Sequence, residues 1–221
     1  MGNENGRNRR RGGTITAVIV VGYLALRLGL LAWREHESGM STGGIVLSVI
    51  GFAALVVVVA EATLAVHHAR TRRREAALIV QHPTAHLVPV LVHKDLGQQL
   101  RHAAGVLGQA LPDVPRRGYA TLVADGHGIG LYTGGAEPRL LLGVPRPAVQ
   151  AVADGETSAA GRYAFGKVDA LRVLVGTGAP VAVDFPVYRT VLGFPKTLRG
   201  EELAERVRAV AGSAGVPVAT G

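Results

Sequence analysis

Hydrophobic residues are concentrated in two runs in the first third of the chain, each of which contains a single charged residue. They cover residues 14–33 and 44–66, which are 20 and 23 residues long. At about 1.5 Å of rise per residue, a helix of either length crosses a hydrocarbon layer about 30 Å thick. Residues 45–60 of the second run are apolar on every face, whereas a core helix of a globular domain keeps a polar stripe. The pattern therefore predicts a two-helix transmembrane hairpin with an external loop over residues 34–43.

Arginine clusters flank this predicted hairpin on the sides away from the loop. The first cluster contains Arg7, Arg9, Arg10 and Arg11, and the second contains Arg70, Arg72, Arg73 and Arg74. Cationic flanks of membrane helices stay on the cytoplasmic side. We therefore predict a protein integral to the cytoplasmic (inner) membrane with both termini cytoplasmic, in which residues 1–13 form a basic tail. A cleaved signal peptide fits less well, because the first run contains Arg27 and ends without a small-residue cleavage site.

Two ionisable residues, Arg27 and Glu61, fall inside the predicted spans. Such groups are costly in lipid and are functional candidates for that reason. Two interpretations stay open: each side chain extends toward the nearer membrane surface, or the two line an ion or proton pathway.

Beyond the second run, the pattern predicts a helical stalk and linker over residues 67–117. The helix continues without proline or glycine until Pro83 ends it. A short apolar segment, Leu87–Val92, follows as a strand. Hydrophobic residues then recur every three or four positions, which predicts an amphipathic helix over residues 94–111.

From Tyr119 onward the hydrophobic period changes to two, which is typical of strands. Three hairpins are expected, and they pair Tyr119–Ala124 with Gly128–Thr133, Arg139–Val144 with Ala148–Ala153, and Ala170–Val175 with Val181–Tyr188. The chain closes with an amphipathic helix over residues 200–212 and a flexible tail over residues 213–221.

This succession of short strands and one closing helix resembles the bacterial pleckstrin-homology-like (PH-like) domains that are attached to membrane hairpins. The resemblance covers about residues 118–212 and is carried by the segments ATLVADGHGIGLYTGG, RLLLGVPRPAVQAV, ALRVLVGTGAPVAVDF and GEELAERVRAV. It implies a cytoplasmic α+β domain, namely a small antiparallel PH-like split β-barrel closed by a C-terminal helix and used as a scaffold. The turn at Asp125–Gly128 lacks lysine and arginine, so recognition of inositol lipids is not carried over.

Charge and composition narrow the function classes. The net charge of +8 arises mainly from the two arginine clusters, because residues 75–221 hold 14 basic against 12 acidic residues. This distribution disfavours a nucleic-acid partner and favours anionic membrane lipids near the arginine clusters. Cysteine is absent, and no hydrolase, phosphate-loop or metal-ligand motif is present. We therefore expect no enzyme activity, cofactor or metal.

The predicted function is a non-enzymatic integral membrane protein that tethers a PH-like interaction domain at the cytoplasmic face of the membrane. Its protein partner is unknown, and a homo-oligomer is left open. The alternative is an oligomeric ion or small-solute transport component that uses Arg27 and Glu61. The candidate residues at the membrane surface are Arg9, Arg10, Arg11, Arg70, Arg72, Arg73 and Arg74.

Overall fold

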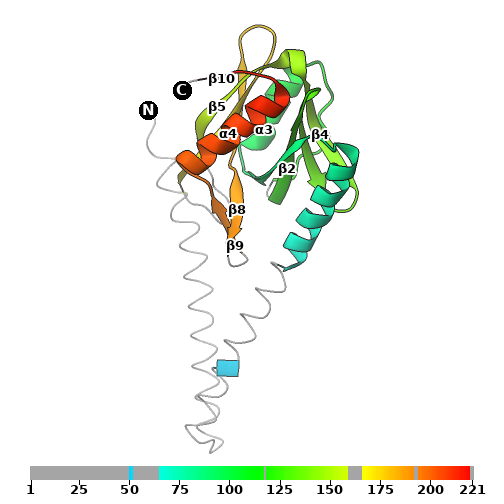
Figure 1. The fold of residues 1–221 in the computed structure, drawn as a ribbon, viewed down its shortest axis with the longest axis vertical. Coiled ribbons are helices and arrows are strands. Elements are labelled where there is room, and N and C mark those ends of the chain that lie inside the picture. The colour runs from blue at the N-terminus through cyan, green and yellow to red at the C-terminus, as the bar shows by residue number, and fades with distance from the viewer. Residues whose placement is uncertain (1–49, 52–64, 117, 159–165, 192–193, 220–221) are drawn as a thin grey trace, which may run out of the picture. The chain divides into compact units, whose positions relative to one another are not determined.

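The structure is a computed structural model that describes residues 50–51, 65–116, 118–158, 166–191 and 194–219. The chain divides into two compact units, Met1–Ala62 and Thr63–Gly221. Only Ile50 and Gly51 of the first unit are described, so the fold below is that of the second unit (Figure 1).

The second unit begins in a helix that is described over residues 65–81. The elements that follow are β1 (His86–Val92), α3 (Leu96–Val106), β2 (Gly118–Asp125), β3 (Gly128–Gly134) and β4 (Pro138–Pro145). The four strands form an antiparallel sheet in the order β1-β2-β3-β4. We call it the first sheet.

A short 3-10 turn, η1 (Arg146–Ala148), leads into the second half of the domain. Its elements are β5 (Val149–Ser158), β6 (Lys167–Val175), β7 (Val181–Phe185), β8 (Tyr188–Val191), β9 (Phe194–Thr197), α4 (Glu201–Ala214) and β10 (Val218–Ala219). The second sheet has the order β10-β5-β6-β7, in which β10 lies parallel to β5, and β8 pairs with β9 in a separate ribbon.

One hydrophobic core joins the two larger sheets with α3 and α4. Alternate residues of β2, such as Leu122, and of β6, such as Leu171 and Val173, are buried in it. The helix α4 contributes one apolar face that includes Leu203, Val207 and Val210, and it contacts β5, β2, β6 and β1. Successive side chains of a strand point to opposite faces, so alternate residues of these strands enter the core.

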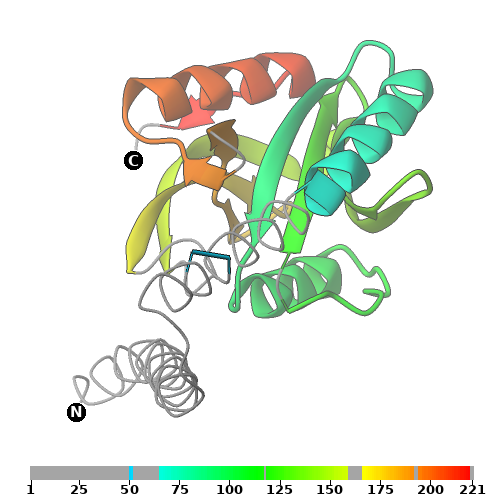
Figure 2. The ribbon, with the colours of Figure 1, turned by 90° about the horizontal axis from the view of Figure 1, so that it is seen from below.

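The other face of the first sheet is covered by the helix of residues 65–81. Thr121 and Val123 of β2 point to this face and are almost fully buried. Leu78 of the helix is fully buried there, yet it stands apart from the main core cluster. Figure 2 shows this helix, in cyan, alongside the green strands of the first sheet and apart from α4.

Two of the three expected hairpins are present in the structure. β2 pairs with β3 across the turn at Gly126, and β6 pairs with β7. The expected pairing of Arg139–Val144 with Ala148–Ala153 is wrong, because β4 belongs to the first sheet and β5 to the second. The η1 turn carries the chain from one sheet to the other instead of folding it back.

The structure contradicts the predicted fold class in two respects. The described strands form three separate sheets that do not close, so the PH-like split β-barrel is corrected. Among the described residues, no helix combines the length and the apolar character that crossing a bilayer requires. This finding contradicts the predicted transmembrane hairpin. It also contradicts the predicted integral membrane location with cytoplasmic termini. Residues 1–49 and 52–64, which hold most of that hairpin, lie outside the described residues.

The β2–β3 turn provides a test of this fold. Gly128 has φ of 142°, and a Cβ there would overlap the Val144 carbonyl oxygen and lie 2.9 Å from Arg146 N. We expect Gly128→Ala to lower the free energy of unfolding by about 2 kcal/mol or more, since both the backbone angle and the space exclude a side chain. Gly126→Ala, in the same turn and with open space around it, is the matched control and should change stability little. Equal urea midpoints for the two variants would contradict the arrangement.

Candidate anion-binding site

Arg74 is a buried cation in the contact between the helix of residues 65–81 and the first sheet. Its side chain is only 2% exposed. Its Nε donates a hydrogen bond to Thr121 Oγ1 at 2.9 Å, and its Nη1 donates to the carbonyl oxygens of Tyr119 at 3.2 Å and Gly134 at 3.0 Å. All three acceptors are neutral. Among the described residues, no carboxylate forms an ion pair with this guanidinium.

The third nitrogen of this guanidinium, Nη2, is buried and has no hydrogen-bond partner among the described residues. Burial lowers the pKa of Arg74, with only partial opposition from the charges of Tyr188 and Glu75. A guanidinium nevertheless keeps its proton in proteins, so the charge remains. Leaving a charged donor buried and unpaired costs on the order of a few kcal/mol. An anion that reaches Nη2 would remove this cost.

A pocket of about 740 Å³ lies directly beside Arg74. It is bordered by the helix, by the strand ends near Tyr119 and Thr133, and by the turn between β3 and β4. The charged residues around it are Arg70, Arg73, Arg74, Arg139, Asp113 and Glu137. Among the described residues, four arginines and two carboxylates therefore line the pocket, which is a formal excess of two positive charges.

Aromatic rings form one side of this region. The rings of His67 and Tyr119 lie 5.6 Å apart, and those of Tyr119 and Tyr188 lie 5.3 Å apart. Burial raises the pKa of Tyr188 to about 12, against a smaller lowering by a hydrogen bond with Thr71 and by the charge of Arg74. Burial also raises the pKa of Glu75. Tyr188 is therefore a neutral phenol near pH 7 and supplies no counter-charge to Arg74.

A second polar contact holds the far end of the same helix. His82 Nδ1 lies 3.0 Å from Asp125 Oδ2 at the end of β2, and Tyr132 Oη lies 3.2 Å from His82 Nε2. Burial alone would raise the pKa of Asp125, but hydrogen bonds from the His127 amide and from His82 hold it below its usual value. The ionised carboxylate accepts the Nδ1 proton, so a neutral His82 accepts the Tyr132 hydroxyl proton at Nε2.

This chain of three residues superficially resembles a catalytic relay, but it does not activate a nucleophile. Burial and the negative charge of Asp125 raise the pKa of Tyr132, so its hydroxyl stays protonated. A nucleophilic tyrosine requires the opposite shift. The ring also lies over Gly130, where a Cβ would come within 2.7 Å of Tyr132 Cε2. The contact is therefore a clamp that fastens the helix to β2 and β3.

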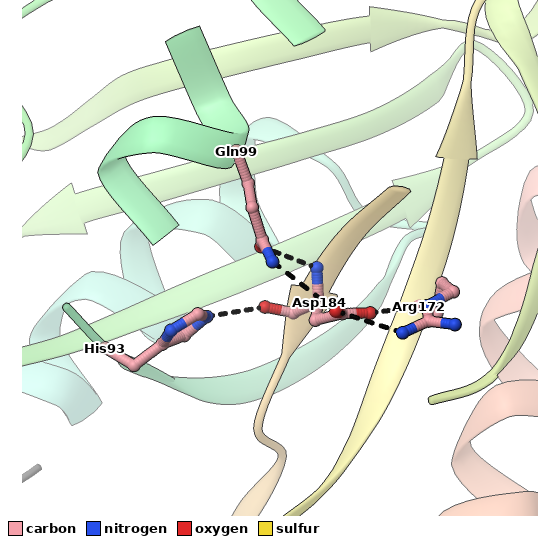
Figure 3. A network of polar contacts seen from close by, with 4 residues as sticks. All are labelled: His93, Gln99, Arg172 and Asp184. Carbon is pink, nitrogen blue, oxygen red and sulfur yellow. Dashed lines mark hydrogen bonds and ion pairs between the residues drawn. The ribbon is translucent and has the colours of Figure 1, made fainter. Parts of the chain in front are cut away.

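A third polar group, centred on Asp184 of β7, lies in the body of the domain (Figure 3). Arg172 donates from Nε to Asp184 Oδ1 at 2.7 Å and from Nη2 to Oδ2 at 3.2 Å. Gln99 of α3 accepts a bond from Asp184 N at 3.0 Å and donates to Oδ2 at 3.4 Å. His93 Nε2 lies 3.0 Å from the Asp184 carbonyl oxygen.

These contacts engage both carboxylate oxygens of Asp184, which is 5% exposed, so the network ties α3 to the second sheet. The hydrogen bonds to Asp184 raise the pKa of Arg172. Burial lowers the pKa of His93, which keeps the imidazole neutral and able to donate to the backbone. We interpret the network as structural.

The predicted site residues fall into two groups. Arg70, Arg72 and Arg73 are exposed on the helix, whereas Arg74 is buried in the domain. Arg70, Arg73 and Arg74 border the pocket, and Arg72 does not. The other predicted residues, Arg9, Arg10, Arg11, Arg27 and Glu61, lie outside the described residues. Thr121, Tyr119 and Arg139, which complete the site, were not predicted.

Comparison of this chain with protein-family models, with curated proteins and with solved structures finds no match. The resemblance to PH-like domains therefore stays a prediction. Within the part of the chain that the structure describes, no group of three histidine, cysteine, aspartate or glutamate residues is placed to hold a metal ion.

Gly155 tests the Asp184 network. A Cβ at this position would lie 2.9 Å from Arg172 Nε and 3.0 Å from Asp184 Oδ1. We expect Gly155→Ala to force the ion pair apart and to lower the free energy of unfolding by about 1–3 kcal/mol. Gly143→Ala, on a strand where the nearest atom is an ordinary contact at 3.5 Å, is the control. If both variants retain the wild-type thermal midpoint, the network does not constrain the strand.

The raised pKa of Tyr188 predicts how the stability of the domain changes with pH in the alkaline range. Its folded pKa of about 12 exceeds the ordinary value of 10.0, so the folded state favours the neutral phenol. The resulting stabilisation is complete below pH 10 and is lost as the pH rises through 12, by up to about 3 kcal/mol. Urea unfolding of the wild type and of Tyr188→Phe over this range should show a steeper decline for the wild type. Parallel curves would contradict the buried phenol.

Proposed function

We propose that the domain of residues 63–221 is a non-enzymatic binding module, and that the pocket beside Arg74 binds an anionic group of its ligand. The observation that supports this most strongly is the buried guanidinium of Arg74, whose Nη2 has no partner among the described residues. Arginine binds phosphate and carboxylate groups through paired hydrogen bonds, and Nη2 offers such a donor.

The surroundings of Arg74 favour this proposal over a purely structural role. A buried charge is ordinarily paired with an opposite charge, as the buried carboxylate of Asp184 is with the half-buried Arg172 in the same domain. Arg74 instead lies beside an open pocket to which three further arginines contribute. Their combined positive charge would attract an anion and hold it in contact with the buried donor.

The reactive side chains of the described residues favour a binding role over catalysis. Tyr132 and Tyr188 are held as neutral phenols, and the Asp184 carboxylate is paired with Arg172 and accepts a hydrogen bond from Gln99. Neither tyrosine is poised as a nucleophile or as a base near neutral pH. The pocket beside Arg74 offers hydrogen-bond donors and positive charge, which suit recognition.

The ligand's anionic group has two chemically equivalent sources, a small soluble molecule and the headgroup of an anionic lipid. Arginine clusters attract anionic headgroups by about 1 kcal/mol per residue near a membrane surface. Binding experiments on the full-length protein should therefore include a probe for each source. One probe is inorganic phosphate, followed by calorimetry, and the other is vesicles of phosphatidylcholine alone or mixed with an equimolar amount of phosphatidic acid, followed by cosedimentation.

We expect binding to at least one of these phosphate probes, and we expect Arg70→Ala and Arg139→Ala to weaken it by roughly tenfold each. Both side chains are exposed, so the variants should fold. Arg72→Ala removes an equally exposed arginine from the same helix but not from the pocket, and it should retain wild-type affinity. Equal losses for all three variants would indicate unspecific attraction to the helix and would contradict the proposed site, as would no binding to either probe.

A further inference from the structure

The helix of residues 65–81 is attached to the first sheet by few contacts. Only Arg74 and Leu78 are buried within it, whereas Ile79 is 56% exposed and Val80 is 82% exposed. An amphipathic helix of a globular domain normally buries a continuous apolar stripe. Here one leucine and one arginine carry most of the attachment, so anything that alters the environment of Arg74 alters how firmly the helix is held.

The attachment is unequal along the helix. At the C-terminal end, His82 is clamped to Asp125 and Tyr132 by two hydrogen bonds. At Arg74, two turns earlier, the attachment depends on a charged group that lacks one of its partners. The segment before Arg74 has no buried residue, and its contacts with the rest of the domain include the ring contact of His67 with Tyr119 and the hydrogen bond between Thr71 and Tyr188. The part of the helix that borders the pocket is therefore held by polar and ring contacts and not by buried apolar side chains.

The pocket draws its positive charges from both sides of this contact. Arg70, Arg73 and Arg74 belong to the helix, whereas Arg139 belongs to β4 and follows the turn that accepts a hydrogen bond from Arg74 at Gly134. An anion in the pocket would therefore contact two elements that are far apart in the sequence. The formal excess of two positive charges in the pocket matches a doubly charged anion better than a singly charged one.

From this arrangement we infer that the pocket takes a phosphate-type dianion, which bridges the helix of residues 65–81 and the β3–β4 turn and so fastens the helix to the sheet. The inference rests on the proposed function and adds the ligand class and the consequence of binding. A ligand that binds only the docked helix stabilises that state by linkage. Occupancy of the pocket then controls how often the helix leaves the sheet.

Hydrogen exchange of the full-length protein, measured by mass spectrometry, tests this directly. Inorganic phosphate at about pH 8, where it is a dianion, is the first probe, and phosphatidic acid in phosphatidylcholine vesicles is the second. At a phosphate concentration about ten times the Kd, linkage predicts roughly tenfold slower exchange in peptides that cover residues 67–75 and 134–139. Peptides of α4, which lies away from the pocket, serve as the internal control and should not change.

Two comparisons make the test specific. Arg139→Gln changes a residue of the sheet side only, yet it should reduce the slowing in the helix from roughly tenfold to roughly twofold at equal phosphate concentration, whereas Arg72→Gln should preserve it. Acetate, a singly charged anion, should bind roughly tenfold more weakly than phosphate or sulfate at the same pH. Protection by phosphate in solution would identify a soluble ligand, and protection by vesicles alone would identify a lipid headgroup.

The results that would contradict this inference differ from the results that would contradict the proposed function. If calorimetry shows phosphate binding but exchange in residues 67–75 stays the same, the binding module stands and the fastening of the helix is wrong. If acetate binds as tightly as phosphate, or if Arg139→Gln leaves the slowing intact, the bridging dianion is wrong. If no phosphate probe binds to the wild type, both proposals are wrong.

Discussion

The burial of Arg74 without a carboxylate partner is the constraint on which this account of the domain depends. A guanidinium that lies almost wholly out of water must satisfy its donors within the protein, and three of them are satisfied by Thr121, Tyr119 and Gly134. Those bonds hold the helix of residues 65–81 on the first sheet and leave Nη2 buried without a partner among the described residues, in a residue that borders a basic pocket. The side chain of Arg74 therefore both attaches the helix to the sheet and forms part of the candidate site. Elsewhere in the domain, the pairing of Arg172 with Asp184 shows how the same chain compensates a charge that serves only structure.

The domain combines a well-packed body with a lightly attached helix. The body has a continuous core between the two larger sheets, closed by α4 and tied to α3 through Asp184. The helix of residues 65–81 adds one buried leucine on the opposite face of the first sheet, and its other buried contacts include the hydrogen bonds of Arg74 and of the neighbouring His82. Regions with few buried apolar contacts open at lower free energy than the core does. A binding site between such a helix and a rigid sheet couples recognition to local motion without disturbing the body.

Local signals in the sequence were sufficient for the elements whose partners are close in the chain. The turn at Gly126 predicted the pairing of β2 with β3, and the acidic start and apolar face of residues 201–211 predicted α4. The pairing of β4 and β5 was missed because Pro145-Arg146-Pro147 has the composition of a hairpin turn, whereas the choice of sheet is decided by distant strands. Arg74 was predicted as a membrane-surface residue and its burial was missed, because it is one of four similar arginines in its cluster. Its partner Thr121 lies 47 residues away, and the local signal that could have shown the burial is the spacing of Arg74, Leu78 and His82 on one helix face.

The central claim is that an oxyanion completes the hydrogen bonding of Arg74. A crystal structure of the full-length protein grown with selenate, a dianion that scatters anomalously, measures this most directly. The account predicts an anomalous peak in the pocket within hydrogen-bond distance of Arg74 Nη2, with Arg139 on its other side. A pocket without selenate at concentrations that saturate phosphate binding, or an Arg74 whose Nη2 is bonded to a protein carboxylate, would contradict it.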